Sequence, residues 1–165
     1  MSKYLPRRAA FTLTAIAALT LSACAQESTD PASPDAGTES EFSFGSPAEA
    51  ADADRVIEMQ ATDSLTFEPA EVTVAPGETV TFRLVNQGNL VHDFTLGDQA
   101  TQDEHEAEMA EMGDMAHEEP NVATIPAGET IEFTWTFSES GTVLIGCHQP
   151  GHYAAGMTGQ ITVEG

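Results

Sequence analysis

The interpretation of this chain starts from residues 147–157, Cys147-His148-Gln149-Pro150-Gly151-His152-Tyr153-Ala154-Ala155-Gly156-Met157. Four residues separate Cys147 from His152, and four more separate His152 from Met157. Pro150-Gly151 favours a turn in the first interval, because proline fixes φ and glycine tolerates a positive φ. The segment can therefore fold back and present a thiolate, an imidazole and a thioether to one point.

A second imidazole lies far upstream, in Leu90-Val91-His92-Asp93-Phe94. One thiolate, two imidazoles and one thioether suit copper in a trigonal His₂Cys site with a long axial Met. Structural zinc sites usually contain close pairs of Cys and His, which this sequence lacks. An inert buried thiol at Cys147 and core packing of Met157 are simpler alternatives, but they leave the spacing, the turn and His92 unexplained. We expect copper at His92, Cys147, His152 and Met157.

The sequence around these residues has the two-residue periodicity of β-strands. Turn-forming residues separate the strands, and Pro126-Ala127-Gly128-Glu129-Thr130 echoes Ala75-Pro76-Gly77-Glu78-Thr79. Short strands at regular spacing with Pro-Gly turns predict an all-β sandwich. The expected strands cover residues 56–60, 65–67, 71–74, 79–85, 91–96, 131–137, 142–146 and 159–163.

This region resembles the cupredoxins, the blue-copper family that includes plastocyanin, azurin, rusticyanin and auracyanin. The similarity rests on Phe67-Glu68-Pro69, the turn and strand at 76–82, the Asn86 loop, His92 and the Cys-x4-His-x4-Met spacing. That spacing is similar to rusticyanin and auracyanin, and is one residue longer than azurin at the Met. The resemblance covers about Val56 to Gly165 and implies a Greek-key β-sandwich with copper at one end. It also implies that His92, Cys147 and His152 are equatorial ligands and Met157 the axial one.

Two residues beside these ligands have their own expectations. His148 directly follows Cys147, so on an extended strand it points to the opposite face. We expect it on the surface or supporting the ligands, rather than as a ligand itself. Asp93 stands where Asn is common in the family. It is either an exposed loop carboxylate or a group that lowers the reduction potential of the site through hydrogen bonds or charge.

A short helical insertion near 101–117 interrupts the strands, with a helix expected from about Gln102 to Met112 and a candidate capping box at Thr101-x-x-Glu104. It resembles the His- and Met-bearing insertion of cupredoxins associated with bacterial copper tolerance. Imidazole and thioether ligands suit Cu(I), whereas the same methionines could simply cover the sandwich. Its acids do not match an EF-hand calcium loop. The candidate second copper site comprises His105, Met109, Met112, Met115 and His117.

The first 23 residues have the features of a secretory signal peptide. Lys3, Arg7 and Arg8 precede an apolar run of 13 residues, which is too short to span a bilayer. Leu21-Ser22-Ala23-Cys24 resembles a lipobox, so we expect lipidation of Cys24, with a plain signal peptide as the alternative. A twin-arginine signal is a further option for export.

Residues 24–54 are rich in small and acidic residues and are expected to form a disordered tether after the lipidated Cys. The domain itself is expected to span residues 55–165. We therefore expect an exported, membrane-anchored lipoprotein that faces the periplasm or the extracellular space.

The charge of the chain restricts its partners. It has 27 Asp and Glu against 5 Lys and Arg, a formal charge of −22. Loss of the first 23 residues would leave 2 basic and 27 acidic residues, a charge of −25. Nucleic acid is excluded as a partner, because phosphate binding needs clustered Lys and Arg. We expect a monomer that meets the membrane only through its lipid anchor, and any redox partner should be basic.

Two functions fit these features. A copper site with a second cluster of soft ligands favours copper binding and tolerance outside the cytoplasm. The same His₂Cys-Met set also suits a dedicated one-electron carrier without a copper-handling role. A copper oxidase or nitrite reductase would need further His clusters, and 5 His in the chain are too few. We therefore expect no enzymatic activity.

Overall fold

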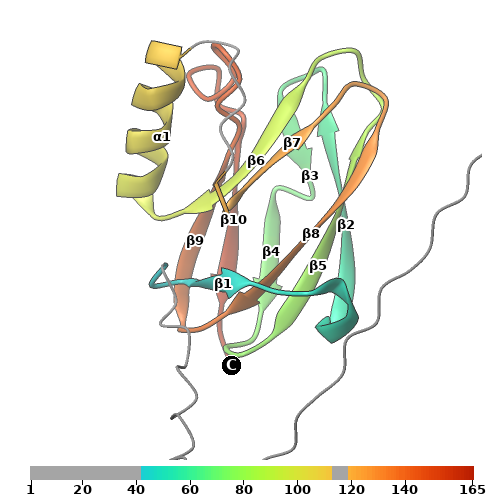
Figure 1. Cartoon of the computed structure of the whole chain (residues 1–165), viewed down its shortest axis with the longest axis vertical. Coiled ribbons are helices and arrows are strands. Elements are labelled where there is room, and N and C mark those ends of the chain that lie inside the picture. Colours follow the sequence, from blue (N-terminus) through green and yellow to red (C-terminus); the bar gives the residue numbers. More distant parts are fainter. Residues whose placement is uncertain (1–41, 113–118) are drawn as a thin grey trace, which may run out of the picture. The chain divides into compact units, whose positions relative to one another are not determined.

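The computed structural model describes residues 42–112 and 119–165 (Figure 1). Within them, two five-stranded sheets enclose one core, and helix α1 lies beside the second sheet. The helices are η1 (Ala50–Asp52) and α1 (Gln99–Met112). The strands are β1 (Gly45–Pro47), β2 (Arg55–Thr62), β3 (Thr66–Glu68), β4 (Glu71–Val74), β5 (Thr79–Asn86), β6 (His92–Gly97), β7 (Val122–Ile125), β8 (Thr130–Phe137), β9 (Gly141–Gly146) and β10 (Thr158–Val163).

The strand order confirms the predicted β-sandwich. Sheet A has the order β1-β8-β5-β2-β3, and sheet B has the order β4-β10-β9-β6-β7. The β2–β5 and β4–β10 pairs are parallel, whereas the other pairs are antiparallel. The expected strands all occur, but β1 and β7 were not predicted. Strand β7 pairs with β6 and so extends sheet B beyond the strand that begins with His92.

Aromatic rings join the two sheets. Phe82 on β5 and Phe94 on β6 are fully buried, and their ring centroids lie 5.3 Å apart. Phe67 on β3 meets Phe94 edge-on at 6.0 Å. Buried aromatic pairs in such geometries add roughly 0.5–1.5 kcal/mol beyond the burial of their area. The alternating apolar residues of the sequence therefore form one continuous core between the sheets.

The two echoing turns have the same local structure. Gly77 and Gly128 adopt φ values of +80° and +75°, in the left-handed region that favours glycine. In each turn, the residue after the glycine donates its N–H to a carbonyl three positions earlier at 3.1 Å. The first turn joins β4 to β5 and the second joins β7 to β8, so the repeated motif marks two equivalent corners.

Residues before Arg55, within the stretch predicted as a tether, already pack onto the sandwich. Strand β1 pairs with β8, and Phe42 and Phe44 lie against Trp135 with ring centroids 5.5 Å away in both cases. Trp135 is fully buried. Phe42 and Phe44, two positions apart, supply apolar contacts that the acidic composition of this stretch did not predict. Residues 24–41 of the predicted tether lie outside the described residues.

Helix α1 begins three residues before the predicted start. Asp98 Oδ1 accepts hydrogen bonds from the N–H and the hydroxyl of Thr101, both at 2.9 Å. This is the role of an N-cap, so the predicted capping box at Thr101 is wrong. The helix is described as far as Met112, and residues 113–118 of the insertion lie outside the described residues.

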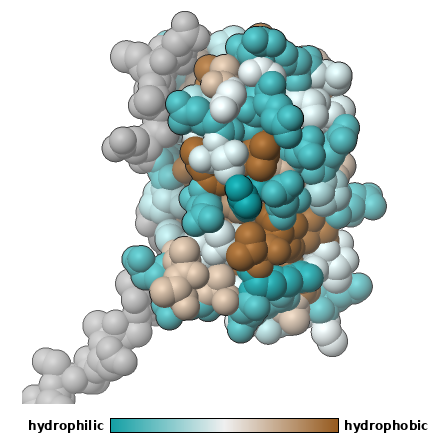
Figure 2. Space-filling model, turned by 90° about the vertical axis from the view of Figure 1, so that its right-hand side faces the viewer, coloured by the Kyte–Doolittle hydropathy of each residue, from teal (hydrophilic) through white to brown (hydrophobic). Residues whose placement is uncertain are grey.

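The side of the molecule seen in Figure 2 is mainly hydrophilic and carries a few apolar patches. The large apolar side chains that are exposed include Val56, Leu90 and Val91, at 61%, 42% and 39%. Leu90 and Val91 directly precede His92 in the sequence. Among the described residues, no helix combines the length and hydropathy that crossing a bilayer requires.

Candidate metal centre

The predicted ligands come from one end of sheet B. His92 opens β6, and Cys147 directly follows the last residue of β9. These strands are antiparallel neighbours, with Thr95 opposite Gly146, so the start of β6 lies next to the end of β9. His152 and Met157 lie on the loop between β9 and β10. Strand pairing thus brings together a histidine and a cysteine that are 55 positions apart.

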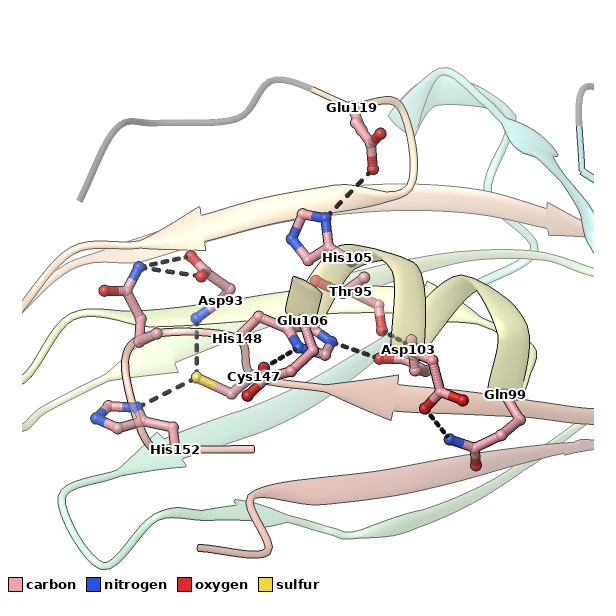
Figure 3. A network of polar contacts seen from close by, with 12 residues as sticks. Asp93, Thr95, Gln99, Asp103, His105, Glu106, Glu119, Cys147, His148 and His152 are labelled. Atoms are coloured by element: carbon pink, nitrogen blue, oxygen red, sulfur yellow. Dashed lines mark hydrogen bonds and ion pairs between the residues drawn. The ribbon is translucent and has the colours of Figure 1, made fainter. Parts of the chain in front are cut away.

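Three donor atoms converge at this end. Cys147 Sγ lies 3.9 Å from His92 Nδ1 and 3.3 Å from His152 Nδ1 (Figure 3 shows the second contact). A metal about 2.3 Å from sulfur and about 2.0 Å from nitrogen, with ligands at ~120°, separates S and N by about 3.7 Å. The two observed distances bracket that value. The three side chains are therefore arranged to share one metal ion.

The loop folds back as its sequence predicts. The Cys147 N–H donates to the carbonyl of Met157 at 3.2 Å, and the Met157 N–H donates to the carbonyl of His152 at 3.0 Å. Met157 is fully buried. Gly151 adopts a φ of +83°, as the Pro150-Gly151 turn requires. The backbone of the fourth predicted ligand is thus held against the first residue of the loop.

Two of the three converging donors are shielded from water. His92 and Cys147 are fully buried, whereas His152 is partly exposed. Burial raises the pKa of Cys147 to about 12, although N–H groups of Asp93 and Gln149 act in the opposite direction. Metal ligation requires the thiolate, so binding must displace the thiol proton. Burial, followed by the nearby His152, lowers the pKa of His92 and favours the neutral imidazole that metals bind.

Asp93 is buried rather than exposed, so the loop-carboxylate alternative is wrong. Its side chain is 2% exposed and accepts hydrogen bonds from Gln149 Nε2 at 3.1 and 3.0 Å and from the Thr124 hydroxyl at 3.0 Å. Its backbone N–H donates to Cys147 Sγ at 3.3 Å (Figure 3). The residue therefore connects β6, β7 and the ligand loop around the sulfur. Sequence reasoning did not identify Gln149 as part of this arrangement.

His148 points away from the three donors, as predicted for a residue that follows Cys147 on an extended chain. It is only 1% exposed, so a surface position is excluded. Its Nδ1 lies 2.7 Å from Glu106 Oε2, and its Nε2 lies 2.7 Å from Gln102 Oε1. Gln102 Nε2 donates to the carbonyls of Thr95 and Leu144. Helix α1 is thereby hydrogen-bonded to β6 and to β9, the strand that leads into Cys147.

The donor set decides the metal. A thiolate, two imidazoles and a neighbouring thioether residue are the ligands that select copper in a trigonal site. A family model described as "Copper binding proteins, plastocyanin/azurin family" matches residues 53–164. The chain belongs to this family. It is a cupredoxin, and copper is its cofactor. When bound, copper supplies one-electron chemistry at a site where His92, Cys147, His152 and Met157 would hold it.

Curated relatives with a more specific description cover most of the chain. A protein of Rubrivivax gelatinosus named "Copper-resistant cuproprotein CopI" is 39% identical over 121 residues, which is 73% of each chain. The protein of the same name from Pseudomonas aeruginosa is 38% identical and covers 73% of this chain and 82% of its own. Among solved structures, auracyanin B is similar with a TM-score of 0.62 and 25% identity, over 74% of this chain and 97% of its own.

The predicted second copper site is only partly within the described residues. His105 and Met109 lie on α1 and are buried, at 2% and 8% exposure. Met115 and His117 lie outside the described residues, as does the side chain of Met112. The Cu(I) site therefore stays a prediction. His105 Nδ1 instead lies 3.5 Å from Glu119 Oε2 (Figure 3), a contact that the sequence spacing did not suggest.

Proposed function

We propose that this cupredoxin is exported, is anchored by lipid at Cys24, and binds copper outside the cytoplasm as part of copper tolerance. The observation that carries the proposal is the convergence of Cys147 Sγ with the Nδ1 atoms of His92 and His152. The names of its CopI relatives support the tolerance role. The proposal assigns binding and storage of copper to the chain, and no catalytic turnover.

The copper centre is tested by titrating the full-length apoprotein with Cu(II) and recording visible absorption and bound copper. We expect an intense thiolate-to-copper band, which Cys147→Ser abolishes. Cys24→Ser is the matched control, because it removes the other cysteine of the chain and should leave the band unchanged. A band that survives Cys147→Ser, or copper bound without any band, would overturn the assignment.

Export and anchoring rest on the amino-terminal sequence. Lys3, Arg7 and Arg8 before an apolar run suit export, and the lipobox-like residues 21–24 suit acylation. Cells fed a labelled fatty acid should incorporate it into the wild-type chain and not into Cys24→Ser. The wild type should also fractionate with membranes. Label in the Cys24→Ser chain, or a soluble wild type in the cytoplasm, would contradict this part of the proposal.

The tolerance role requires a test in cells. A strain that lacks the gene should grow more poorly than its parent in added copper, and the wild-type gene should restore growth. The Cys147→Ser gene should fail to restore it, although the protein accumulates. Full restoration by Cys147→Ser would separate tolerance from the copper centre and contradict the proposal.

A dedicated electron carrier is the second candidate. Leu90 and Val91 are exposed immediately before the buried ligand candidate His92, which gives a partner an apolar contact next to the metal. The acidic chain should attract a basic partner, so the transfer rate should fall as salt screens the charges. A growth defect of the deletion strain without added copper would favour this role. A defect only in added copper would favour tolerance.

A further inference from the structure

The helical insertion brings together one imidazole and two carboxylates, none of them among the candidate copper ligands. His105 and Glu108 lie on α1, and Glu119 lies just before β7. One ligand atom from each of these residues falls within 4.8 Å of the other two. His105 is 2% exposed, whereas the side chain of Glu119 is 34% exposed. The cluster is thus anchored by a buried ring and opens toward solvent through its carboxylates.

The backbone explains why the three residues meet. His105 and Glu108 are three positions apart on one helix, and residues at that spacing share a face. Glu119 returns from the other end of the insertion, and its Oε2 lies 3.5 Å from His105 Nδ1 (Figure 3). Two ligands about 2.1 Å from a tetrahedral ion lie about 3.4 Å apart. A single cation would therefore tie the end of the insertion back onto its helix.

The surrounding charge favours a cation at this position. Helix α1 carries five acids and no Lys or Arg. The basic residues in the described part of the chain are Arg55 and Arg83, which lie on β2 and β5 of sheet A. Arg55 already pairs with Glu78 at 2.6 Å. No lysine or arginine on the helix balances the carboxylates, whereas a divalent cation would neutralise two of them.

We propose that His105, Glu108 and Glu119 bind a divalent cation of the borderline class, Zn(II) or Cu(II), at a site separate from the copper centre. Imidazole with carboxylates suits these ions, whereas calcium needs six to eight oxygen ligands and Cu(I) prefers sulfur. The site shares no ligand with the copper centre. His148 connects the two sites: its ring centroid lies 4.9 Å from that of His105, and it is adjacent in sequence to Cys147. The inference does not depend on the role proposed for the copper centre.

The test is calorimetric titration of the copper-loaded full chain with Zn(II), which is redox-inert. We expect one zinc per chain in addition to the copper, with the visible copper band unchanged. Glu119→Gln and Glu108→Gln should each weaken zinc binding at least about tenfold, because each removes a ligand oxygen charge. Glu104→Gln is the matched control on the same helix, since it removes an equal charge outside the cluster. It should change the affinity by less than about twofold.

Two further measurements separate this site from its rivals. Met109→Leu should leave zinc binding unchanged, because no thioether is required. Cu(II) added to the copper-loaded chain should compete with zinc and give an electron paramagnetic resonance signal distinct from that of the thiolate-bound copper. Absence of zinc binding, equal weakening by Glu104→Gln, or loss of binding in Met109→Leu would each overturn the proposal. An intact copper band in every variant shows that the fold survives, independently of zinc.

Discussion

The backbone N–H of Asp93 donates a hydrogen bond to Sγ of Cys147 at 3.3 Å. The donor follows His92 directly, so one short stretch of β6 supplies both an imidazole of the candidate copper site and a hydrogen bond to the sulfur. A backbone donor persists whatever side chain occupies position 93. The Asp93 side chain then acts separately, by holding Gln149 and Thr124 and by placing a buried negative charge near the site.

We predict that Asp93→Asn raises the reduction potential of the copper centre. The substitution removes a buried negative charge that stabilises the oxidised, more positive state of the site, and it leaves the backbone bond to Cys147 in place. The expected rise is tens of millivolts, where ~60 mV corresponds to about 1.4 kcal/mol for one electron. Spectroelectrochemical titration of the two proteins measures it.

Glu164→Gln serves as the control for this prediction, because it removes an equal charge from an exposed position near the carboxyl terminus. The reduction potential of Glu164→Gln should differ from that of the wild type by much less than the potential of Asp93→Asn does. A potential that falls in Asp93→Asn, or that rises equally in Glu164→Gln, would show that the carboxylate does not act locally on the site.

We predict that Gln102→Ala destabilises the apoprotein by about 2–4 kcal/mol. Gln102 is fully buried, donates to the carbonyls of Thr95 and Leu144, and accepts from His148. Its loss would leave these buried polar groups without that partner, which costs roughly 1–3 kcal/mol for each group left unsatisfied. Urea unfolding of the metal-free chain measures the change.

Gln99→Ala is the matched control for Gln102→Ala, since Gln99 is an exposed residue of the same helix whose side chain donates to the exposed Asp103. It should change the free energy of unfolding by no more than about 0.5 kcal/mol. Equal effects of the two substitutions would mean that the helix does not depend on its buried amide.

The convergence of the candidate copper ligands could be predicted because their signal is local and chemically distinctive. Cys147, His152 and Met157 are regularly spaced around a Pro-Gly turn, and few other functions combine those donor types. His92 could be assigned to the same site because it begins a strand that the sequence predicts. The fold followed from the same alternation and from the two echoing turns, which need glycine where φ is positive.

The contacts of the insertion could not be predicted in the same way. Helical periodicity places His105 beside Met109, but it does not say which element the helix packs on. Gln102 and Glu106 contact His148, which lies 46 and 42 positions further along the chain. Glu119 contacts His105, but the sequence between these two residues has no periodicity that would predict the contact. Such pairs follow from the docking of α1 on sheet B, which no local pattern in the sequence records.

We predict that Phe44→Ala destabilises the domain by about 1–3 kcal/mol, because Phe44 stacks on the buried Trp135 at 5.5 Å. Urea unfolding of the apoprotein checks it, with tryptophan fluorescence as the probe because the chain has one tryptophan. Ser43→Ala, at an exposed neighbouring position, should have little effect. An unchanged stability in Phe44→Ala would mean that the residues before Arg55 contribute little to the domain, as the predicted boundary at Arg55 implies.

Asp63 fixes the loop that leads into β6. Its carboxylate accepts hydrogen bonds from the N–H of Asn89 at 2.9 and 3.0 Å and from the N–H of Leu90 at 3.2 Å. These bonds, with that of Asn89 first, lower the pKa of Asp63 below its usual 3.8. The unfolded chain therefore takes up a proton at a higher pH than the folded chain does. The stabilising contribution is complete above 3.8 and is lost as the pH falls through the folded pKa.

We predict that Asp63→Asn lowers the urea midpoint of the apoprotein near neutral pH, and that the difference from the wild type shrinks as the pH falls below about 4. The amide cannot accept at both oxygen positions, so the loop before His92 loses hydrogen bonds at every pH at which the wild-type carboxyl is ionised. Urea midpoints of both proteins at about pH 6, 4 and 3 measure the trend. Glu68→Gln, an exposed charge on the neighbouring β3, should show no comparable narrowing. If the difference in urea midpoint between Asp63→Asn and the wild type stays constant with pH, ionisation of the Asp63 carboxyl does not stabilise the folded state.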